Sequence, residues 1–184
     1  MKVYLDSIGC RLNQAEIEAY ARQFHSQGHT LVSTAHEADL VVINTCAVTK
    51  AAVSDSRQKI RQVKRQGASE VCVTGCWSTL QPLEAAAFDG VKYVVPNSQK
   101  DQLVTGVLNL PPKIFDSEPL ERLIVPGVRQ RTRAFLKVQD GCNNHCSYCI
   151  TTLARGESRS QPPVDPPHGA AARIRYDRSR PSRS

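Results

Sequence analysis

Hydrophobic residues follow two different spacings along the first 110 residues of the chain. The continuous apolar run at 40–44 is typical of a strand that is buried on both faces of a parallel sheet. By contrast, the large apolar residues between 13 and 27 recur at helical spacing. The whole pattern predicts strands at 2–6, 40–44, 70–74 and 91–95, which alternate with helices at 13–27, 51–65, 79–88 and 100–108. This alternation indicates an α/β fold with an open parallel sheet.

Residues 1–110 are therefore expected to form one domain, and the rest of the chain divides into three parts. Residues 111–133 are a linker rich in proline and charge. Residues 134–139 are expected to be a strand that runs into a cysteine loop, so 134–161 predicts the start of an incomplete β/α barrel. Residues 162–184 have too few large apolar groups to offset the entropy of ordering, and we expect them to be disordered.

Composition and charge narrow the functional classes. No apolar run approaches the ~20 residues of a membrane helix, and the first residues lack the apolar stretch of a signal peptide. Seven cysteines without such a signal favour a reduced compartment, so we predict a cytoplasmic protein with no membrane partner. The formal net charge of +7 is compatible with a phosphate-rich partner, and equally with a solvated basic surface.

Three cysteines, Cys10, Cys46 and Cys76, each come shortly after the end of an expected strand. Ligands of open α/β sheets bind beyond the carboxyl ends of the strands, so we expect these thiols to lie at one edge of the sheet as metal ligands. Gly9 and Gly75 precede two of them, and glycine lets the backbone approach a bound group closely. The alternative is three unrelated buried thiols, because free cysteine is often buried.

The other candidate ligands, Cys142, Cys146 and Cys149, are spaced C-x3-C-x2-C. Thiolates suit zinc, copper(I) and iron–sulfur clusters. Structural zinc normally has four ligands, so a triad without a nearby fourth favours an iron–sulfur cluster with one iron open to a substrate or cofactor. A zinc-binding structural module is the weaker alternative. Cys72 lies inside an expected strand and is predicted to be a core residue.

Several blocks of the chain resemble the radical-SAM methylthiotransferase family. The blocks are Gly9-Cys-Arg-Leu-Asn-Gln14, Asn44-Thr-Cys-Ala-Val-Thr49, Val73-Thr-Gly-Cys76, Phe135-Leu-Lys-Val-Gln-Asp-Gly-Cys142, Ala154-Arg-Gly156 and Ser158-Arg-Ser160. Together with the cysteine loop, they extend the resemblance over about residues 1–161. One local departure is the stretch 150–153, where family members usually have a proline and this chain has none.

The resemblance implies two [4Fe–4S] clusters and S-adenosyl-L-methionine (SAM) as cofactors. One cluster would be held by Cys10, Cys46 and Cys76, and the other by Cys142, Cys146 and Cys149. The second cluster would bind SAM, with Tyr148 and Arg155 as further SAM contacts, and electron transfer to SAM would release a deoxyadenosyl radical. The first would present the sulfur to be inserted, and a second SAM would supply the methyl group. An electron donor such as flavodoxin or ferredoxin is also implied.

The substrate class follows from the same resemblance. Known substrates of the family are adenosines beside the tRNA anticodon and one aspartate of a ribosomal protein. The blocks around Cys10, Cys46 and Cys142 most resemble the branch that acts on threonylcarbamoyladenosine, so the anticodon region of tRNA is the expected partner. Modification of isopentenyladenosine in tRNA, or of the ribosomal-protein aspartate, is the alternative.

The tail at 162–184 does not resemble the family, whose members continue with most of a partial barrel and an RNA-binding β-domain. It is either a basic RNA-binding segment or, as its content of arginine, proline, alanine and serine favours, the product of out-of-frame translation. We therefore expect a truncated, cluster-binding polypeptide that does not itself methylthiolate tRNA.

Overall fold

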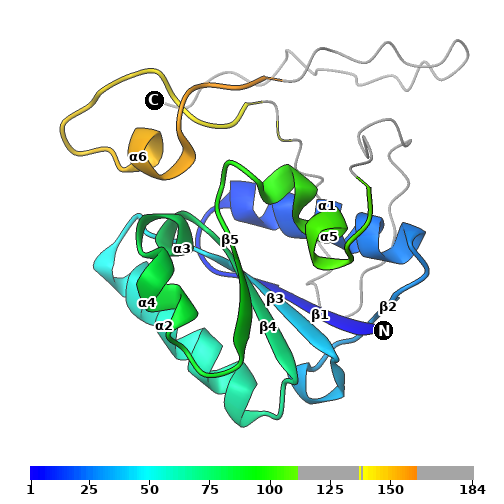
Figure 1. The fold of residues 1–184 in the computed structure, drawn as a ribbon. Coiled ribbons are helices and arrows are strands. Elements are labelled where there is room, and N and C mark those ends of the chain that lie inside the picture. Colours follow the sequence, from blue (N-terminus) through cyan, green and yellow to red (C-terminus); the bar gives the residue numbers. More distant parts are fainter. Residues whose placement is uncertain (112–136, 138, 161–184) are drawn as a thin grey trace, which may run out of the picture.

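The computed structural model describes residues 1–111, 137 and 139–160, which fold around a five-stranded sheet (Figure 1). All paired strands are parallel, in the order β2-β1-β3-β4-β5. The strands are β1 Lys2–Ser7, β2 Thr30–Leu31, β3 Leu40–Thr45, β4 Glu70–Gly75 and β5 Val91–Val95. The prediction of an α/β fold with a parallel sheet is confirmed.

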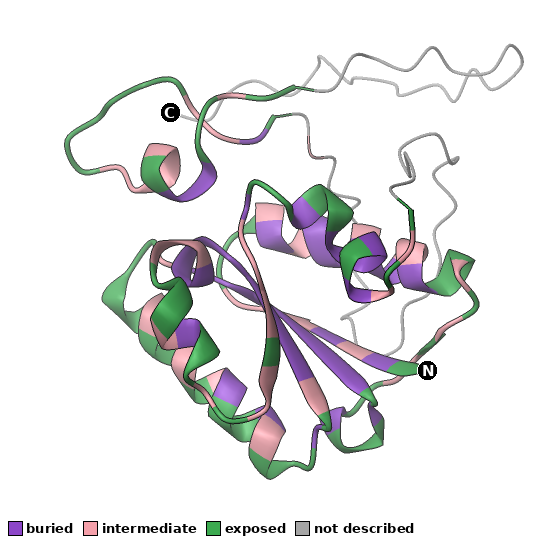
Figure 2. Ribbon diagram, viewed as in Figure 1, coloured by how far each residue is buried: buried purple, intermediate pink, exposed green. Residues whose placement is uncertain are grey.

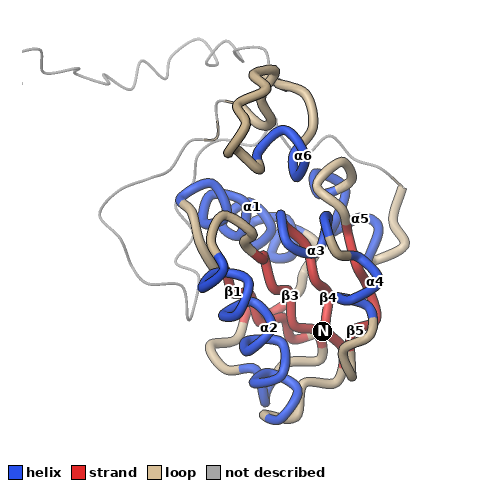
Figure 3. Tube along the Cα trace, turned by 90° about the vertical axis from the view of Figure 1, so that its left-hand side faces the viewer, coloured by secondary structure: helices blue, strands red, loops and turns tan. Residues whose placement is uncertain are grey.

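Helices cover both faces of the sheet (Figure 3). The α-helices are α1 Arg11–Ser26, α2 Lys50–Arg65, α3 Cys76–Leu80, α4 Pro82–Ala86, α5 Leu103–Val107 and α6 Thr151–Arg155, and the 3₁₀ helices are η1 Ala35–Glu37 and η2 Lys100–Gln102. α1 and α5 pack on one face, whereas α2, α3 and α4 pack on the other. α6 lies beyond the carboxyl ends of the strands, where it packs against α3.

β3 lies in the centre of the sheet and is buried over its whole length (Figure 2). Leu40 and Val42 pack in one hydrophobic cluster with Phe24 of α1, whereas Val41 and Ile43 pack in a second cluster with α2. Burial of one such side chain contributes about 1.5–3 kcal/mol. Both faces of β3 therefore need apolar residues, which explains the continuous apolar run at 40–44.

The predicted strands agree with the structure to within one residue, but two predicted helices differ. The helix expected at 79–88 is divided into α3 and α4. Pro82 begins α4, and Gln81 before it has φ −130° and ψ 58°, outside the helical region, because a residue before proline is disfavoured there. The helix expected at 100–108 begins as the 3₁₀ helix η2. β2 was not predicted, because two residues give no periodic signal.

The segment 139–160 is a loop that closes on itself around α6. Asp140 and Arg159 form an isolated antiparallel bridge, with N–O distances of 2.9 and 2.7 Å. The backbone N–H of Cys142 donates to the carbonyl oxygen of Gly156 at 3.1 Å. These bonds hold the two ends of the cysteine loop together.

The linker expected at 111–133, the strand at 134–139 and the tail at 162–184 lie almost entirely outside the described residues. The start of a barrel therefore stays a prediction, as do the domain boundaries. Among the helices that the structure describes, none combines the length and the apolar character needed to cross a bilayer.

Gly75 at the end of β4 gives a test of the strand pairing. It has φ 99° and ψ −170°, a conformation essentially restricted to glycine. A Cβ atom there would lie 2.3 Å from the carbonyl oxygen of Thr45 and 2.4 Å from Oδ1 of Asn44. We expect Gly75→Ala to lower the free energy of unfolding in urea by more than about 3 kcal/mol, because strain and overpacking add.

Gly67→Ala is the matched control for this measurement. Gly67 has φ +94°, but nothing lies within 4 Å of a Cβ atom built there. Only backbone strain opposes that change, so we expect a loss of about 1 kcal/mol. An equal loss of unfolding free energy in the two variants would show that the close contact between Gly75 and β3 does not contribute to the cost of the substitution.

Candidate functional site

The first cysteine triad, Cys10, Cys46 and Cys76, lies at the carboxyl edge of the sheet. Cys46 directly follows β3 and Cys76 directly follows β4, whose last residues Thr45 and Gly75 are paired in register. Neighbouring strands lie about 4.8 Å apart, so the two cysteines start from adjacent backbone positions. Cys10 stands before α1 and follows β1, which is the other neighbour of β3. The strand-end placement expected from the sequence is therefore observed.

Gly9 allows the turn before Cys10 to approach Cys46 closely. Its φ is +100°, and a Cβ atom there would lie 2.5 Å from both Cβ and Sγ of Cys46. The backbone N–H of Cys46 in turn donates to Oγ of Ser56 in α2 at 3.2 Å. The Cys46 side chain can thus lie against this turn only because residue 9 has no side chain.

The sulfurs of this triad differ in their surroundings, because Cys10 is exposed while the other two cysteines are buried. Sγ of Cys10 lies 3.5 Å from Oδ1 of Asn13. Nδ2 of Asn97 donates toward Sγ of Cys76 at 3.8 Å. Burial raises the pKa of the Cys76 thiol, while the charge and hydrogen bonding of Arg155, together with Asn97, oppose that rise. Donors and a positive charge thus face a sulfur that would be negative as a ligand.

The residues of this edge fit a thiolate-bound anionic group. Thiolates are soft ligands, and the charge of Arg155 suits a group that carries negative charge. A four-iron cluster binds each thiolate through a different iron, so its ligands stand farther apart than those of a single ion. Within the described residues, no three or more His, Cys, Asp or Glu side chains are arranged to hold a metal ion. The ligand roles of both triads therefore stay predictions.

The second cysteine triad, Cys142, Cys146 and Cys149, lies in the loop that precedes α6. The backbone N–H of Cys149 donates to the carbonyl oxygen of Cys146 at 3.1 Å, and the N–H of Asn144 donates to Sγ of Cys142 at 3.4 Å. Hydrogen bonds with the side chain and the backbone of Thr151 lower the pKa of the Cys149 thiol. A lower pKa favours the thiolate, which is the form that binds metals.

Cys72 is a core residue, as predicted. Its side chain is fully buried in the hydrophobic cluster between the sheet and α1. Burial raises the pKa of its thiol to about 12. Cys72 is therefore a protonated thiol at neutral pH, and it serves below as a control residue.

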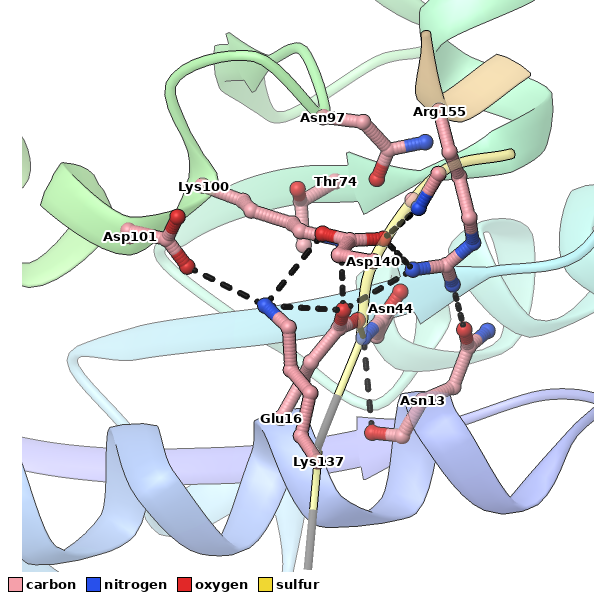
Figure 4. A network of polar contacts seen from close by, with 12 residues as sticks. Asn13, Glu16, Asn44, Thr74, Asn97, Lys100, Asp101, Lys137, Asp140 and Arg155 are labelled. Atoms are coloured by element: carbon pink, nitrogen blue, oxygen red, sulfur yellow. Dashed lines mark hydrogen bonds and ion pairs between the residues drawn. The ribbon is translucent and has the colours of Figure 1, made fainter. Parts of the chain in front are cut away.

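Four charged side chains form a buried ionic network beside the first cysteine triad: Glu16 of α1, Lys100 of η2, Asp140 and Arg155 of α6 (Figure 4). Their side chains are at most 5% exposed. Nζ of Lys100 lies 2.6 Å from Oε1 of Glu16 and also contacts Oδ2 of Asp140. Nη1 of Arg155 lies 3.0 Å from Oε1 of Glu16 and 2.9 Å from Oδ1 of Asp140. Among these four buried groups two carboxylates balance two cations, and the partly exposed Lys137 adds ion pairs at 3.8 Å to Glu16 and 3.3 Å to Asp140.

Amide side chains connect this network to the backbone and to the cysteines. Nδ2 of Asn44 donates to Oε2 of Glu16 at 2.8 Å. Nη2 of Arg155 donates to Oδ1 of Asn13 at 2.7 Å, and that oxygen also contacts the sulfur of Cys10. Every carboxylate oxygen of Glu16 therefore has a partner, which buried charge requires.

The two residues predicted to contact SAM lie in different surroundings. Tyr148, within the second triad, is 90% exposed. Arg155 is buried in the ionic network and donates to Asn13, which contacts the sulfur of Cys10. Burial alone would lower the pKa of Arg155, but Glu16 and the other negative partners raise it overall, so the guanidinium stays charged. Neither SAM contact is tested by this geometry.

The sequence interpretation missed the network, although part of it left a signal. Glu16 follows the helical spacing that places Ile17 and Tyr20 on the buried face of α1, so a charged group falls within an apolar stripe. Asn44 is a polar residue at the end of the most apolar strand. A buried polar group needs a partner. Lys100 gave no comparable signal, because it lies in a short 3₁₀ turn.

Glu16→Gln tests whether the network is ionised. Burial would raise the pKa of Glu16, but Lys100 and Arg155 lower it below its ordinary value. At pH 7 the variant leaves two buried cations with one carboxylate, so we expect a loss of about 3 kcal/mol in unfolding free energy. A carboxylate whose pKa is lower in the folded state stabilises above its unfolded pKa of about 4.3 and loses that contribution as the pH falls.

The difference between wild type and Glu16→Gln should therefore narrow in urea denaturation curves recorded from pH 7 down to pH 3. At low pH a protonated glutamic acid and a glutamine are nearly equivalent. A difference that stays constant over this range would show that Glu16 is neutral in the folded protein.

Comparison with known proteins matches residues 2–96, about half of the chain, to the domain described as Uncharacterized protein family UPF0004. The matched region contains all five strands and the first cysteine triad.

Relatives extend the similarity over most of the chain. It is 37% identical over 177 residues to the threonylcarbamoyladenosine tRNA methylthiotransferase MtaB of Bacillus subtilis, and 39% identical over 158 residues to that of Chlamydia pneumoniae. It is 34% identical over 168 residues to the ribosomal protein uS12 methylthiotransferase RimO of Pseudomonas syringae. These alignments cover 89%, 84% and 89% of this chain, but only 38%, 36% and 38% of the relatives. The chain thus spans little more than a third of the length of these relatives. It belongs to the methylthiotransferase family, and the UPF0004 domain of that family forms the first half of this chain.

Proposed function

We propose that this chain is the amino-terminal part of a radical-SAM methylthiotransferase that modifies threonylcarbamoyladenosine beside the tRNA anticodon. The proposed reaction adds a methylthio group at C2 of the adenine. The observation that carries the proposal is that a member of this family has two cysteine triads, one at the carboxyl edge of the sheet and the other in a loop that is joined to this edge. One triad stands at neighbouring strand ends, and the loop of the other leads into α6, which packs at the same edge of the sheet.

Each triad has a proposed cofactor. Cys10, Cys46 and Cys76 would hold one [4Fe–4S] cluster, and Cys142, Cys146 and Cys149 would hold a second one that binds SAM. When bound, these groups supply the sulfur, the one-electron chemistry and the methyl group. The chain itself provides the Cys149 thiol, whose pKa is lowered by its hydrogen bonds with Thr151, and the exposed ring of Tyr148 for SAM.

The charge of α2 supports a nucleic-acid partner. The helix carries one acidic residue, Asp55, and six basic residues: Lys50, Arg57, Lys59, Arg61, Lys64 and Arg65. Arg57 and Lys59 pair with acidic side chains, while Arg61 and Arg65 are exposed at the surface. Lysine and arginine bind phosphates and release counterions, which suits tRNA. Electrons would come from a small donor protein such as flavodoxin or ferredoxin.

Three alternatives stand beside this proposal, and the first has support of its own. The relatives named for ribosomal protein uS12 are nearly as similar to this chain as those named for tRNA, at 34% against 37% identity. Modification of a ribosomal-protein aspartate is therefore the second candidate, and isopentenyladenosine in tRNA is a third. In a different functional class, the described residues bind clusters without catalysing any transfer.

Single cysteine variants test the two cluster sites. We expect Cys76→Ala and Cys146→Ala each to retain about half of the iron and acid-labile sulfide of the wild type after anaerobic reconstitution, because each triad has no spare ligand. Cys72→Ala is the matched control and should retain all of the iron, because Cys72 is fully buried in the core. Full iron content in Cys76→Ala or Cys146→Ala would contradict the proposed ligands, and loss of all iron would show that the two sites depend on each other.

A substrate comparison tests the proposed reaction. A version of this chain extended to the length of its relatives is reconstituted and supplied with SAM and a reductant. It is offered tRNA that carries threonylcarbamoyladenosine, tRNA that carries isopentenyladenosine, or ribosomal protein uS12, while the 184-residue chain is assayed beside it and is expected to give no product. We expect a methylthio product by mass spectrometry only from the first, and none from a Cys142→Ala control. Product on uS12 alone would overturn the tRNA assignment. Clusters that load but neither cleave SAM nor yield product would favour the binding-only alternative.

A further inference from the structure

We propose that Arg155 is a positioning residue that brings a positive charge from the segment of the second cysteine triad to the first, and thereby raises the reduction potential of a cluster bound there. The inference deepens the proposed function and rests on it in one respect, namely that the first triad holds a cluster. It assigns to Arg155 a role at the first triad, distinct from the SAM contact predicted from the sequence.

The position of Arg155 is tied to that of the second triad. Arg155 is the last residue of α6, and Gly156 after it accepts the backbone hydrogen bond of Cys142. Oγ1 of Thr152 also donates to the carbonyl oxygen of Cys142 at 3.1 Å. Because these bonds close the loop around α6, the second triad and the guanidinium are held as one unit.

That unit contacts the first triad through two asparagines. Oδ1 of Asn13 accepts from Nη2 of Arg155 at 2.7 Å and lies 3.5 Å from the sulfur of Cys10. Nδ2 of Asn97 donates to the carbonyl oxygen of the residue before Arg155 at 2.6 Å and toward the sulfur of Cys76 at 3.8 Å. Two sulfurs of the first triad are thus one side chain away from the end of α6.

The guanidinium is fixed and charged in this position. Glu16 and Asp140 hold Nη1 at 3.0 and 2.9 Å, and the Arg155 side chain is 5% exposed. The contacts of Lys100 are with Glu16 and Asp140, whereas those of Arg155 extend to Asn13 beside the Cys10 sulfur.

A fixed cation near a cluster changes the free energy of adding an electron. Reduction makes a thiolate-bound cluster more negative, so a nearby positive charge stabilises the reduced form. The effect is larger where water is excluded, as it is around Arg155. Docking of the second triad's segment should therefore make the first cluster easier to reduce.

The experiment compares two double variants that leave the buried charges equally balanced. Glu16→Gln with Arg155→Gln removes one carboxylate and the arginine, so Lys100 and Asp140 stay paired. Glu16→Gln with Lys100→Gln removes the same carboxylate and the other cation, so Arg155 and Asp140 stay paired. Both are made in the full chain with Cys142, Cys146 and Cys149 changed to alanine, so that only the first triad can hold a cluster. The potential is read by a redox titration followed by electron paramagnetic resonance.

We expect a shift to lower potential in the variant without Arg155, several times larger than the shift in the variant without Lys100. Arg155→Lys, which keeps a charge but loses the planar fork, should give an intermediate shift. Equal shifts of the reduction potential in the two double variants, or no shift in either, would overturn the inference. A cluster that still loads in these variants would at the same time support the proposed cluster site at the first triad. No iron in the parent with Arg155 intact would overturn both. Urea denaturation shows whether the two double variants differ in folding. If they do, the shift of the reduction potential in Arg155→Lys alone tests the inference.

Discussion

Parallel pairing brings the ends of β1, β3 and β4 to one edge of the sheet, and every contact of the candidate site starts from that edge. The pairing of Thr45 with Gly75 places Cys46 beside Cys76. A slip of one residue would turn each side chain to the opposite face of the sheet. The close approach of Gly75 to the backbone of β3 leaves no room for such a change, so strand register determines the geometry of the first cysteine triad.

The ionic network holds the loop of the second cysteine triad against this edge of the sheet. Burying four charges is costly, and mutual pairing offsets that cost only while all four are present. Glu16 and Lys100 belong to the sheet domain, whereas Asp140 and Arg155 belong to the loop of the second triad. The network therefore joins the sheet domain to the loop of the second cysteine triad through ion pairs.

Much of this arrangement could be predicted from local patterns. Continuous apolar runs gave the strands, and thiols at strand ends gave the placement of the first triad, because both signals lie within a few residues. The division of the helix at Pro82 was also visible but was missed. The ionic network could not be predicted, since Lys100 and Asp140 look like ordinary surface residues until the fold brings them together with Glu16 and Arg155.

The long sequence separation within the network has a consequence for the order of folding. Glu16 is separated by 84 residues from Lys100 and by 139 from Arg155. Closing such long loops costs entropy, so these contacts form after the sheet has assembled from its nearer pairings. During synthesis, where amino-terminal domains fold first, the sheet and the first cysteine triad are complete before Arg155 leaves the ribosome. Until α6 docks, the buried cysteines of the first triad are thus more open to solvent, and to whatever would supply the cluster proposed for them.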